Sequence, residues 1–472
     1  MTDHEVEKSS TTIGLPIAPS MGLVIEQANI IKHETLIDKR TLFIILLASL
    51  IALLVTPIAR LLVYLIGIIT NIAFYGKISN VFSSPANNHL GYFVIIVPVI
   101  GSIIVGFMAR YGSKAIRGHG IPEAMEQILL NDSKIAIRMT FLKPLSAAIA
   151  IGTGGPFGAE GPIIATGGAF GSLIGQIIKT SAHERKTLLA AGAAAGMTAI
   201  FGSPISAILL AIELLLFEFR PRSFIPVAVA TITAMAIRSM IFGVGPMFKL
   251  AVLPGVSSDA LLGYTIEGLA MGFFAVLITK SIYLIEDFFE HLPIHWMWWP
   301  AIGGLVVGII GFVSPETLGV GYDNIDKVLS GVFIGKALAI FCILKFISWS
   351  IALGSGTSGG TLAPIFTIGG GLGVLISQVI SFIFPSSGID LKVAGLVGMA
   401  SCFAGSSRAL FASIIFALET TWQYNGLLPL LAGCTASYLI SALLMKNTIM
   451  TEKLIRRGHH VPTEYHAYHK KG

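Results

Sequence analysis

The 472-residue sequence predicts an all-α integral membrane protein, and three observations support that fold class. Hydrophobic residues make up 54% of the chain and charged residues 12%, with a mean hydropathy of +0.82, which is too apolar for a soluble globular domain. The apolar residues form long runs, without the short dyad alternation of a membrane β-barrel. Backbone that meets lipid must satisfy its own hydrogen bonds, so these runs are predicted to be helices.

The apolar runs define the successive elements, each compared with the ~20 residues that a helix needs to cross a bilayer. Several are too long or too short for a simple span, which indicates tilted and broken helices. We place breaks in the glycine-rich segments 152–161 and 354–360, and the 52 glycines favour close helix packing. The runs lie at 42–75, 92–109, 135–152, 162–179, 186–217, 224–242, 262–288, 297–313, 334–353, 363–384, 392–418 and 425–445.

An internal repeat divides the chain. "PIIATGGAFGSLIGQII" at 162–178 and "PIFTIGGGLGVLISQVI" at 364–380 are identical at nine of seventeen positions, and each follows a glycine-rich loop. Two related halves of this size are typical of transporters, with the ligand site near the midplane. We expect the halves to be inverted. The predicted organisation is an N-terminal segment 1–41, a first repeat 42–242, a linker 243–261, a second repeat 262–446 and a C-terminal stretch 447–472.

The basic residues gather outside the runs. The net charge is +6, and by the positive-inside rule both termini are predicted to lie in the cytoplasm of a multi-pass protein of the cell membrane. This charge balance needs no nucleic acid to explain it. The three cysteines, all in apolar runs, lack metal-ligand spacing and are interpreted as free thiols, so no metal site is predicted. The basic residues concerned include Lys32, Lys39, Arg40, Lys453, Arg456, Arg457, Lys470 and Lys471.

Three segments have the pattern of helix N-termini: "GHGIPEAM" at 118–125, "GAEGP" at 158–162 and "GGTLAP" at 359–364. Glycine lets the backbone turn, and proline is favoured in the first turn of a helix. If these starts lie at membrane depth, their unpaired N–H groups and positive dipole ends face a cavity and favour an anion. Such a site holds an anion without a full positive charge, which suits fast permeation.

Glu160 lies in one of these starts, among glycines and apolar residues. As a carboxylate it would occupy the place of the permeating anion. Once protonated it would lose that attraction, swing away, open the path and carry one proton. We interpret it as a gate, because intramembrane carboxylates are functional by default. The alternatives are a carboxylate that caps its own helix and one that faces a water-filled vestibule.

These residues resemble the CLC family of chloride channels and chloride/proton antiporters over about 42–455. "GHGIPE" is similar to the family's GSGIPE, "GAEGP" to GREGP and "GGTLAP" to GGIFAP, in the same order. Lys143, seventeen residues before Glu160, matches a basic residue that the family keeps near the pore and that shapes its electrostatics. One such motif is a weak signal, but the ordered set together with the internal repeat is a strong one.

The resemblance implies an inverted two-repeat bundle of about eighteen helices and a homodimer with a separate pore in each subunit. The ligand would be chloride, with no other cofactor, and the partners would be other small anions, protons and the bilayer. The central anion would meet the N–H groups of Thr361 and Leu362 beside the side chain at position 119. The implied anion-binding residues are His119, Gly120, Ala159, Gly161, Thr361, Leu362 and Met450, with Glu160 as the gating residue.

At four positions the sequence departs from the family pattern, which limits how many of the family's residue roles can be assigned to this chain. His119 stands where the family has Ser or Pro, and it is expected either to donate to the anion or to bond a nearby carbonyl and turn away. Ala159 replaces an arginine, which removes a positive charge from the outer mouth. Leu214 stands where antiporters of the family often carry an inner proton-relay glutamate. Met450 falls where a pore tyrosine is usual, so that hydroxyl would be missing.

Four other charged residues lie in or beside the apolar runs, and two of them are candidates for proton movement. Glu213 and Glu419 end matching helices and are interpreted as structural, and Glu213 and Glu218 are also the candidate residues for a proton pathway. Glu218 would be either a substitute relay or an exposed carboxylate paired with Arg220 or Arg222. Lys345 is interpreted as a lysine that snorkels to the membrane interface.

The sequence therefore predicts transmembrane chloride or other anion transport, gated by protonation of Glu160 and weakly coupled or uncoupled to protons. The alternatives are a fully coupled chloride/proton antiporter and a carrier for nitrate or an organic anion. No HExxH, GxSxG or paired-aspartate motif supports an enzyme. The 22 residues after Met450 are too few for the cytoplasmic regulatory domain pair of many relatives, and the histidines of "RRGHHVPTEYHAYHKK" are interpreted as a polar tail rather than a metal site.

Overall fold

The computed structural model describes residues 37–459 and 461, so most of the N-terminal segment and of the histidine-containing tail lies outside the described residues. Within them the chain is helical, and its only β-type pairings are two isolated bridges between loops. The helices of the first half are α2 (Lys39–Tyr75), α3 (Ile96–Phe107), α4 (Ile121–Leu130), α5 (Met139–Gly152), α6 (Glu160–Ile177), α7 (Ala182–Phe201), α8 (Pro204–Leu210) and α9 (Pro221–Phe242).

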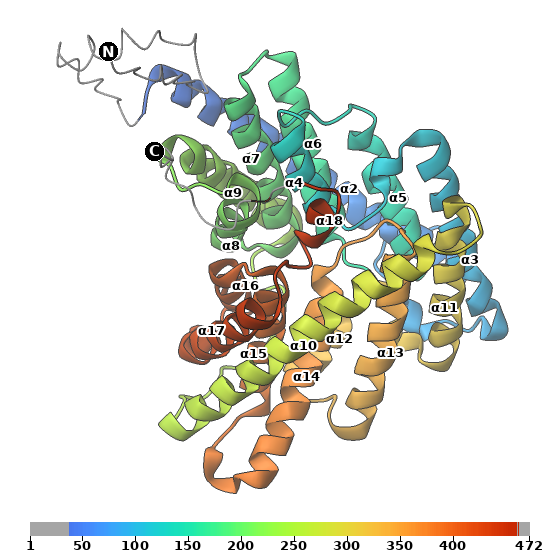
Figure 1. The fold of residues 1–472 in the computed structure, drawn as a ribbon, viewed down its shortest axis with the longest axis vertical. Helices are drawn as coiled ribbons and strands as arrows, with labels where there is room; N and C mark the ends of the chain where they lie inside the picture. The colour runs from blue at the N-terminus through green and yellow to red at the C-terminus, as the bar shows by residue number, and fades with distance from the viewer. Residues whose placement is uncertain (1–36, 460, 462–472) are drawn as a thin grey trace, which may run out of the picture.

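The second half follows in the same order. Its helices are α10 (Ser258–Glu290), α11 (Trp299–Val313), α12 (Tyr322–Leu329), α13 (Gly335–Gly354), α14 (Leu362–Ile383), α15 (Leu391–Ser407), α16 (Leu410–Thr421), α17 (Leu427–Leu444) and the short α18 (Glu452–Arg456). Figure 1 shows α6, α7 and α9 of the first half grouped apart from α14, α15 and α17 of the second, with the long α10 running across them.

Equivalent helices of the two halves make equivalent contacts. The most extensive packing joins α6 to α7 and α14 to α15, and the long helices α2 and α10 pack on α9 and α17. The loops that open α6 and α14 meet in an antiparallel bridge between Gly158 and Gly360. The equivalent loops of the two halves therefore meet each other, and the predicted helical bundle with two related halves is confirmed.

Two apolar runs that the sequence presents as continuous are each broken into separate helices. Run 186–217 ends its first helix at Phe201, because Gly202 adopts a left-handed backbone with φ of +67° and Pro204 starts α8. Run 392–418 ends α15 where Arg408 adopts φ of +60°. Each break is a short segment, GSP at 202–204 and SSR at 406–408, inside an otherwise apolar run, so the length of the run alone does not show that it holds two helices.

Glycines bring the helices of each half into close contact. Gly167 of α6 and Gly192 of α7 face each other so closely that a Cβ on either would overlap the carbonyl oxygen of the other. Gly369 of α14 and Gly398 of α15 repeat this contact in the second half. Close backbone approach maximises van der Waals contact, which drives helix association in lipid, where the hydrophobic effect is absent.

Eight helical segments of the described chain are long and apolar enough to cross a membrane. The 37 residues of α2 exceed a perpendicular span, so this helix must tilt or project. Apolar side chains such as Leu46, 66% exposed, and Phe382, 86% exposed, cover the outside of the bundle. By contrast α4, α8, α12 and α16 are too short to span.

The start of α2 and the C-terminal helix α18 lie on the same face of the molecule. Arg40 pairs with Glu184 at the start of α7, and the histidine before Glu184 lies 3.7 Å from Glu218. Phe217, next to Glu218, lines a small cavity together with Ile455 of α18.

Candidate functional site

Three glycine-rich loops meet in the middle of the protein. The Gly118 N–H donates to Thr357 O over 3.0 Å, and the Gly360 N–H donates to Gly158 O over 3.0 Å. These bonds join the loop before α4, the loop before α6 and the loop before α14. The three helix starts that the sequence singles out are therefore adjacent, although the last two lie about two hundred residues apart in the chain.

Glycine is required where these loops touch. Gly120 adopts φ of +98°, which L side chains rarely adopt, and a Cβ there would overlap the carbonyl oxygen of Gly161. A Cβ on Gly158 would overlap both carboxylate oxygens of Glu160. The glycines thus leave the space that the carboxylate fills.

Glu160 lies across the N-terminus of α14. Its Oε1 accepts a hydrogen bond of 2.7 Å from the Ala363 N–H, and its Oε2 accepts one of 3.3 Å from the Tyr322 hydroxyl. The side chain has no exposed area, and among the described residues no lysine or arginine pairs with it. A helix N-terminus attracts anions, so a backbone donor and a phenol supply what a cation would otherwise provide. Both of these hydrogen bonds therefore come from the second half of the chain.

The other predicted anion-site residues surround this point. Thr361 is the N-cap residue of α14, Leu362 is the first residue of that helix, and both are buried. The Thr361 hydroxyl has no hydrogen-bond partner among the described residues, which leaves a donor available in the interior. Ala159 and Gly161 flank Glu160 at the start of α6 and are also buried.

His119 is 94% buried, with 6% of its side-chain surface exposed, at the bend between the loop and α4. Its Nδ1 has no hydrogen-bond partner within the described part of the chain, so the expected alternative of a bond from this nitrogen to a nearby carbonyl is absent. Burial lowers the pKa of the imidazole to about 4, against the opposing effect of Glu123. His119 is therefore a neutral imidazole near neutral pH.

Two buried lysines hold equivalent loops in the two halves. Lys143 of α5 donates to Ile116 O and Gly118 O, both over 2.8 Å. Lys345 of α13 donates to Thr317 O over 2.8 Å and to Gly319 O over 3.2 Å. The interpretation of Lys345 as a snorkelling residue is wrong, since its side chain has no exposed area. Repeat symmetry explains it, because Lys345 stands where Lys143 stands in the first half.

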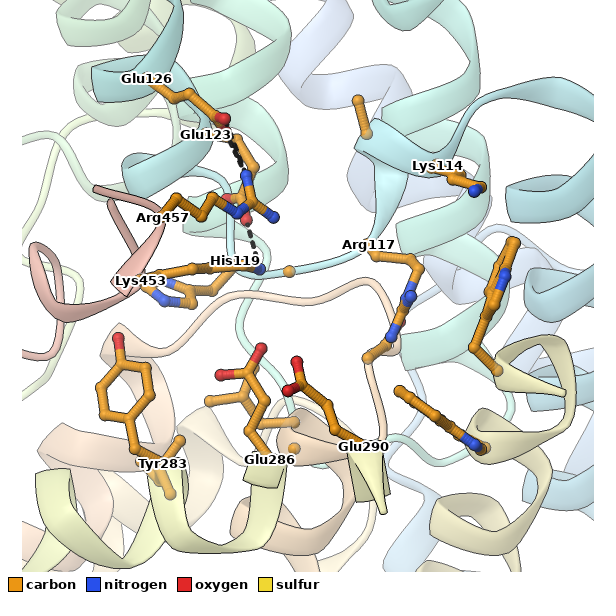
Figure 2. Close-up of a pocket in the computed structure, with 18 of the residues that line it drawn as sticks. Lys114, Arg117, His119, Glu123, Glu126, Tyr283, Glu286, Glu290, Lys453 and Arg457 are labelled. Atoms are coloured by element: carbon orange, nitrogen blue, oxygen red, sulfur yellow. Dashed lines mark hydrogen bonds and ion pairs between the residues drawn. The ribbon is translucent and has the colours of Figure 1, made fainter. Parts of the chain in front are cut away.

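A cavity of about 600 Å³, which we call the mouth cavity, opens beside His119 (Figure 2). It is bounded by the loop before α4, by α4, by the last turns of α10 and by α18. Lys453 lies 3.3 Å from Glu123, and Arg457 lies 2.7 Å from Glu126. Burial opposes ionisation of Glu123, but Lys453 and the neighbouring positive groups outweigh it and lower its pKa to about 2. The charged lining balances: Lys114, Arg117, Lys453 and Arg457 against Glu123, Glu126, Glu286 and Glu290.

Glu213 and Glu419 cap helices across the boundary between the halves. Glu213 accepts from the Phe411 and Ala412 N–H groups at the start of α16, over 3.1 and 3.0 Å. Glu419 accepts from the Ile205 and Ser206 N–H groups at the start of α8, over 2.9 and 2.8 Å. These reciprocal caps agree with the structural interpretation of both residues.

Glu218 lies apart from the site, on the face where α7 and α9 begin. Its Oε1 accepts from the Ser223 hydroxyl over 2.7 Å, and Lys186 and Arg220 each lie 3.9 Å from its carboxylate. It is 14% exposed. The expected pairing with Arg220 is therefore present within a larger basic cluster.

Met450 is fully buried in the turn before α18, where the Ile449 N–H donates to Ser406 O and the Tyr283 hydroxyl donates to Ile449 O. Sequence reasoning missed the two direct partners of Glu160, Tyr322 and Ala363. The repeat contains a signal for the tyrosine: "GVGY" at 319–322 follows the pattern of "GHGI" at 118–121, so residue 322 also starts a helix beside the site.

Comparisons with known proteins agree with this geometry. The family model described as voltage gated chloride channel matches residues 100–442. A ClcB-like chloride channel protein of Ralstonia nicotianae is 27% identical over 349 residues, which cover 73% of this chain and 81% of that protein. The H⁺/Cl⁻ exchange transporter ClcA of Salmonella paratyphi B is 29% identical over 372 residues, which cover 74% and 76%. The structure of a slow cyanobacterial Cl⁻/H⁺ antiporter has a similar fold, with a TM-score of 0.79 at 21% identity over 89% of this chain and 98% of that one.

Proposed function

The chain belongs to the voltage-gated chloride channel (CLC) family, and from that premise we propose that it transports chloride across the cell membrane under the control of Glu160. The proposal rests on one observation above all: the carboxylate of Glu160 is seated on the N-terminal amides of α14 and has no cationic partner among the described residues. Such a position suits a chloride ion equally well, because both are anions that a helix N-terminus attracts.

In this mechanism the Glu160 carboxylate and chloride compete for one binding position at the N-terminus of α14. An ionised Glu160 holds the Ala363 N–H and blocks the path. A protonated Glu160 loses its charge attraction to these amides, leaves, and lets chloride bind there. The neighbouring anion positions are the N–H groups of Thr361 and Leu362 and the side chain of His119. Lys143 orients the loop that carries His119, since it bonds the carbonyl of Gly118.

We propose that chloride movement is coupled weakly or not at all to protons through the inner relay position, where the family's antiporters often carry a glutamate. Leu214 stands there, is only 5% exposed, and holds no proton. Its neighbour Glu213 is engaged by two backbone N–H groups, and Glu218 is held in a cluster with Lys186 and Arg220. Both carboxylates already have hydrogen-bond or ion-pair partners, so neither is an evident substitute for the missing relay glutamate.

A fully coupled chloride/proton antiporter is the second candidate, and one observation favours it: ClcA, to which the chain is 29% identical, is an H⁺/Cl⁻ exchange transporter. We further propose a homodimer, with the face that carries the starts of α2 and α18 in the cytoplasm, because the basic residues near both ends favour that side.

Chloride efflux from proteoliposomes at a series of pH values tests the gate. The wild type is expected to transport faster as the pH falls, because Glu160 leaves its seat when protonated. Glu160→Gln cannot ionise and is expected to transport at a rate independent of pH. Glu316→Gln, which alters an exposed loop carboxylate, is the matched control and should keep the wild-type profile. A pH-dependent Glu160→Gln variant would refute the assignment.

A further inference from the structure

The mouth cavity contains two carboxylates with no ion pair. Glu123 and Glu126 are matched by Lys453 and Arg457, but no salt bridge joins Glu286 or Glu290 to any described residue. Arg117, whose charge acts on Glu286, has its own partners. Its Nε donates to Gly356 O over 3.2 Å, and its guanidinium stacks on two tryptophans of the α11 start.

Glu286 and Glu290 lie one turn apart on α10, so their side chains are neighbours on one face of the helix. Figure 2 shows both carboxylates pointing into the cavity, beside each other. Two carboxylates this close repel when both are ionised, and one shared proton removes the repulsion. Besides each other, the charged groups that act on Glu286 are Lys453 of α18, Glu123 of α4 and Arg117 of the loop before α4.

His119 connects this cavity with the anion site. The residue lines the mouth cavity, yet its Nδ1 is buried without a hydrogen-bond partner among the described residues. Its backbone oxygen lies against Gly161, next to the gating carboxylate. The charged groups that face the imidazole are Glu123 of α4, Lys453 of α18 and Lys143 of α5. His119 therefore lines the mouth cavity with a buried, unpartnered ring nitrogen, and its backbone lies against the loop that carries the gating carboxylate.

We propose that the protons exchanged between Glu160 and this face of the protein pass through the Glu286–Glu290 pair and His119, in place of the relay position occupied by Leu214. This inference rests on the proposed function, because the route supplies the proton that opens the Glu160 gate. Weak coupling between chloride and protons would then occur along this route.

The transfer conserves protons and charge at each step. The carboxylate pair takes one proton from water in the cavity. It passes that proton, through cavity water, to one imidazole nitrogen, while the other nitrogen releases its own proton toward the Glu160 carboxylate. The imidazole ends neutral as the opposite tautomer, the pair ends ionised, and Glu160 ends protonated. Return of the imidazole to its first tautomer completes the cycle.

The test measures chloride and proton movement together in proteoliposomes of the full chain under a chloride gradient. The double variant Glu286→Gln/Glu290→Gln is expected to lower the number of protons moved per chloride by about tenfold or more, because it removes the proton acceptors, while chloride efflux continues. Glu286→Asp/Glu290→Asp, which keeps both acids, should retain proton movement. Glu126→Gln removes one negative charge from the same cavity and should leave the ratio unchanged.

Each result decides between outcomes. A wild-type ratio in the double glutamine variant, or a wild type that moves no protons, overturns the route. An equal loss in Glu126→Gln also overturns it, because the effect would then be one of cavity charge. None of these results tests the assignment of Glu160 as the gate. That assignment is refuted only if Glu160→Gln keeps a pH-dependent chloride flux. Failure of the route and failure of the proposed function are therefore distinguishable.

Discussion

Individual polar side chains in this protein are stabilised by backbone rather than by opposite charge. Lys143 and Lys345 each donate to two loop carbonyls, and Glu160 accepts from an amide N–H of the opposite half. Backbone dipoles stabilise a charge without adding a competing ion at the site. An anion path lined in this way attracts chloride but does not trap it.

At the residue scale, His119 provides a test of anion choice. Because burial lowers its pKa to about 4, the imidazole is neutral between about pH 6 and 8 and offers one N–H rather than a charge. His119→Ser is expected to shift the chloride/nitrate preference, since it changes the size and reach of the donor. The selectivity ratio from competing-anion flux measures this change, and an identical ratio would return His119 to a structural role.

The lowered pKa of His119 also determines the direction in which folding stability changes with pH. The unfolded imidazole binds a proton near pH 6.5, whereas the folded one resists it down to about pH 4. Between these values the unfolded state holds more protons, so folding stability falls as the pH falls through this window. His119→Ser is expected to reduce that acid sensitivity in thermal unfolding experiments.

At the scale of elements, the short helices α8 and α16 depend on each other's half for their caps. Glu419 bonds two N–H groups of α8, and Glu213 bonds two of α16. Helix starts within a membrane have no water to satisfy these donors, so the carboxylates replace it. Glu213 and Glu419 therefore join the two halves as well as capping the starts of α16 and α8.

Replacing either cap removes charge-assisted hydrogen bonds. Glu419→Gln and Glu213→Gln are each expected to destabilise the protein by about 1–3 kcal/mol, measured as a lower midpoint of thermal unfolding in detergent. Glu126→Gln, which breaks a more exposed ion pair with Arg457, should cost less than about 1 kcal/mol. Equal losses in all three variants would contradict the capping role.

At the scale of the whole molecule, the proposed anion site draws on both halves, which the linker joins covalently. Val244 in that linker is 77% exposed, and a Cβ on the neighbouring Gly245 would meet no atom within 4 Å. A chain cut between these residues is expected to function when both pieces are co-expressed, because the reciprocal caps and the Glu160 contact hold them together. Copurification and chloride flux measure this, and flux from the first piece alone would contradict a shared site.

The sequence was sufficient to predict the two related halves and the three helix starts, because glycine–proline punctuation and the repeat are local signals, whereas the repeat alone does not say whether the halves are inverted. The sequence did not separate the helices at the breaks after Phe201 and Ser407, because the polar segments there, GSP at 202–204 and SSR at 406–408, are too short to divide the surrounding apolar runs. It also misplaced Lys345, whose burial depends on a tertiary contact with the loop at 317–319. The repeat indicates that Tyr322 starts a helix beside the site, but its hydrogen bond to Glu160, and that of Ala363, required the assembled structure.

The bond between Glu160 and the Ala363 N–H spans 203 positions, which imposes an order of events during translation. At about 5–20 residues per second, the ribosome needs about 10–40 s to travel from the acid to the residue whose N–H donates to it. For that interval the nascent first half carries an acidic side chain destined for the bilayer interior whose partner has not yet been synthesised. The cell must therefore keep this acid neutral, hydrated or sheltered by the insertion machinery until the second half emerges and the two fold together.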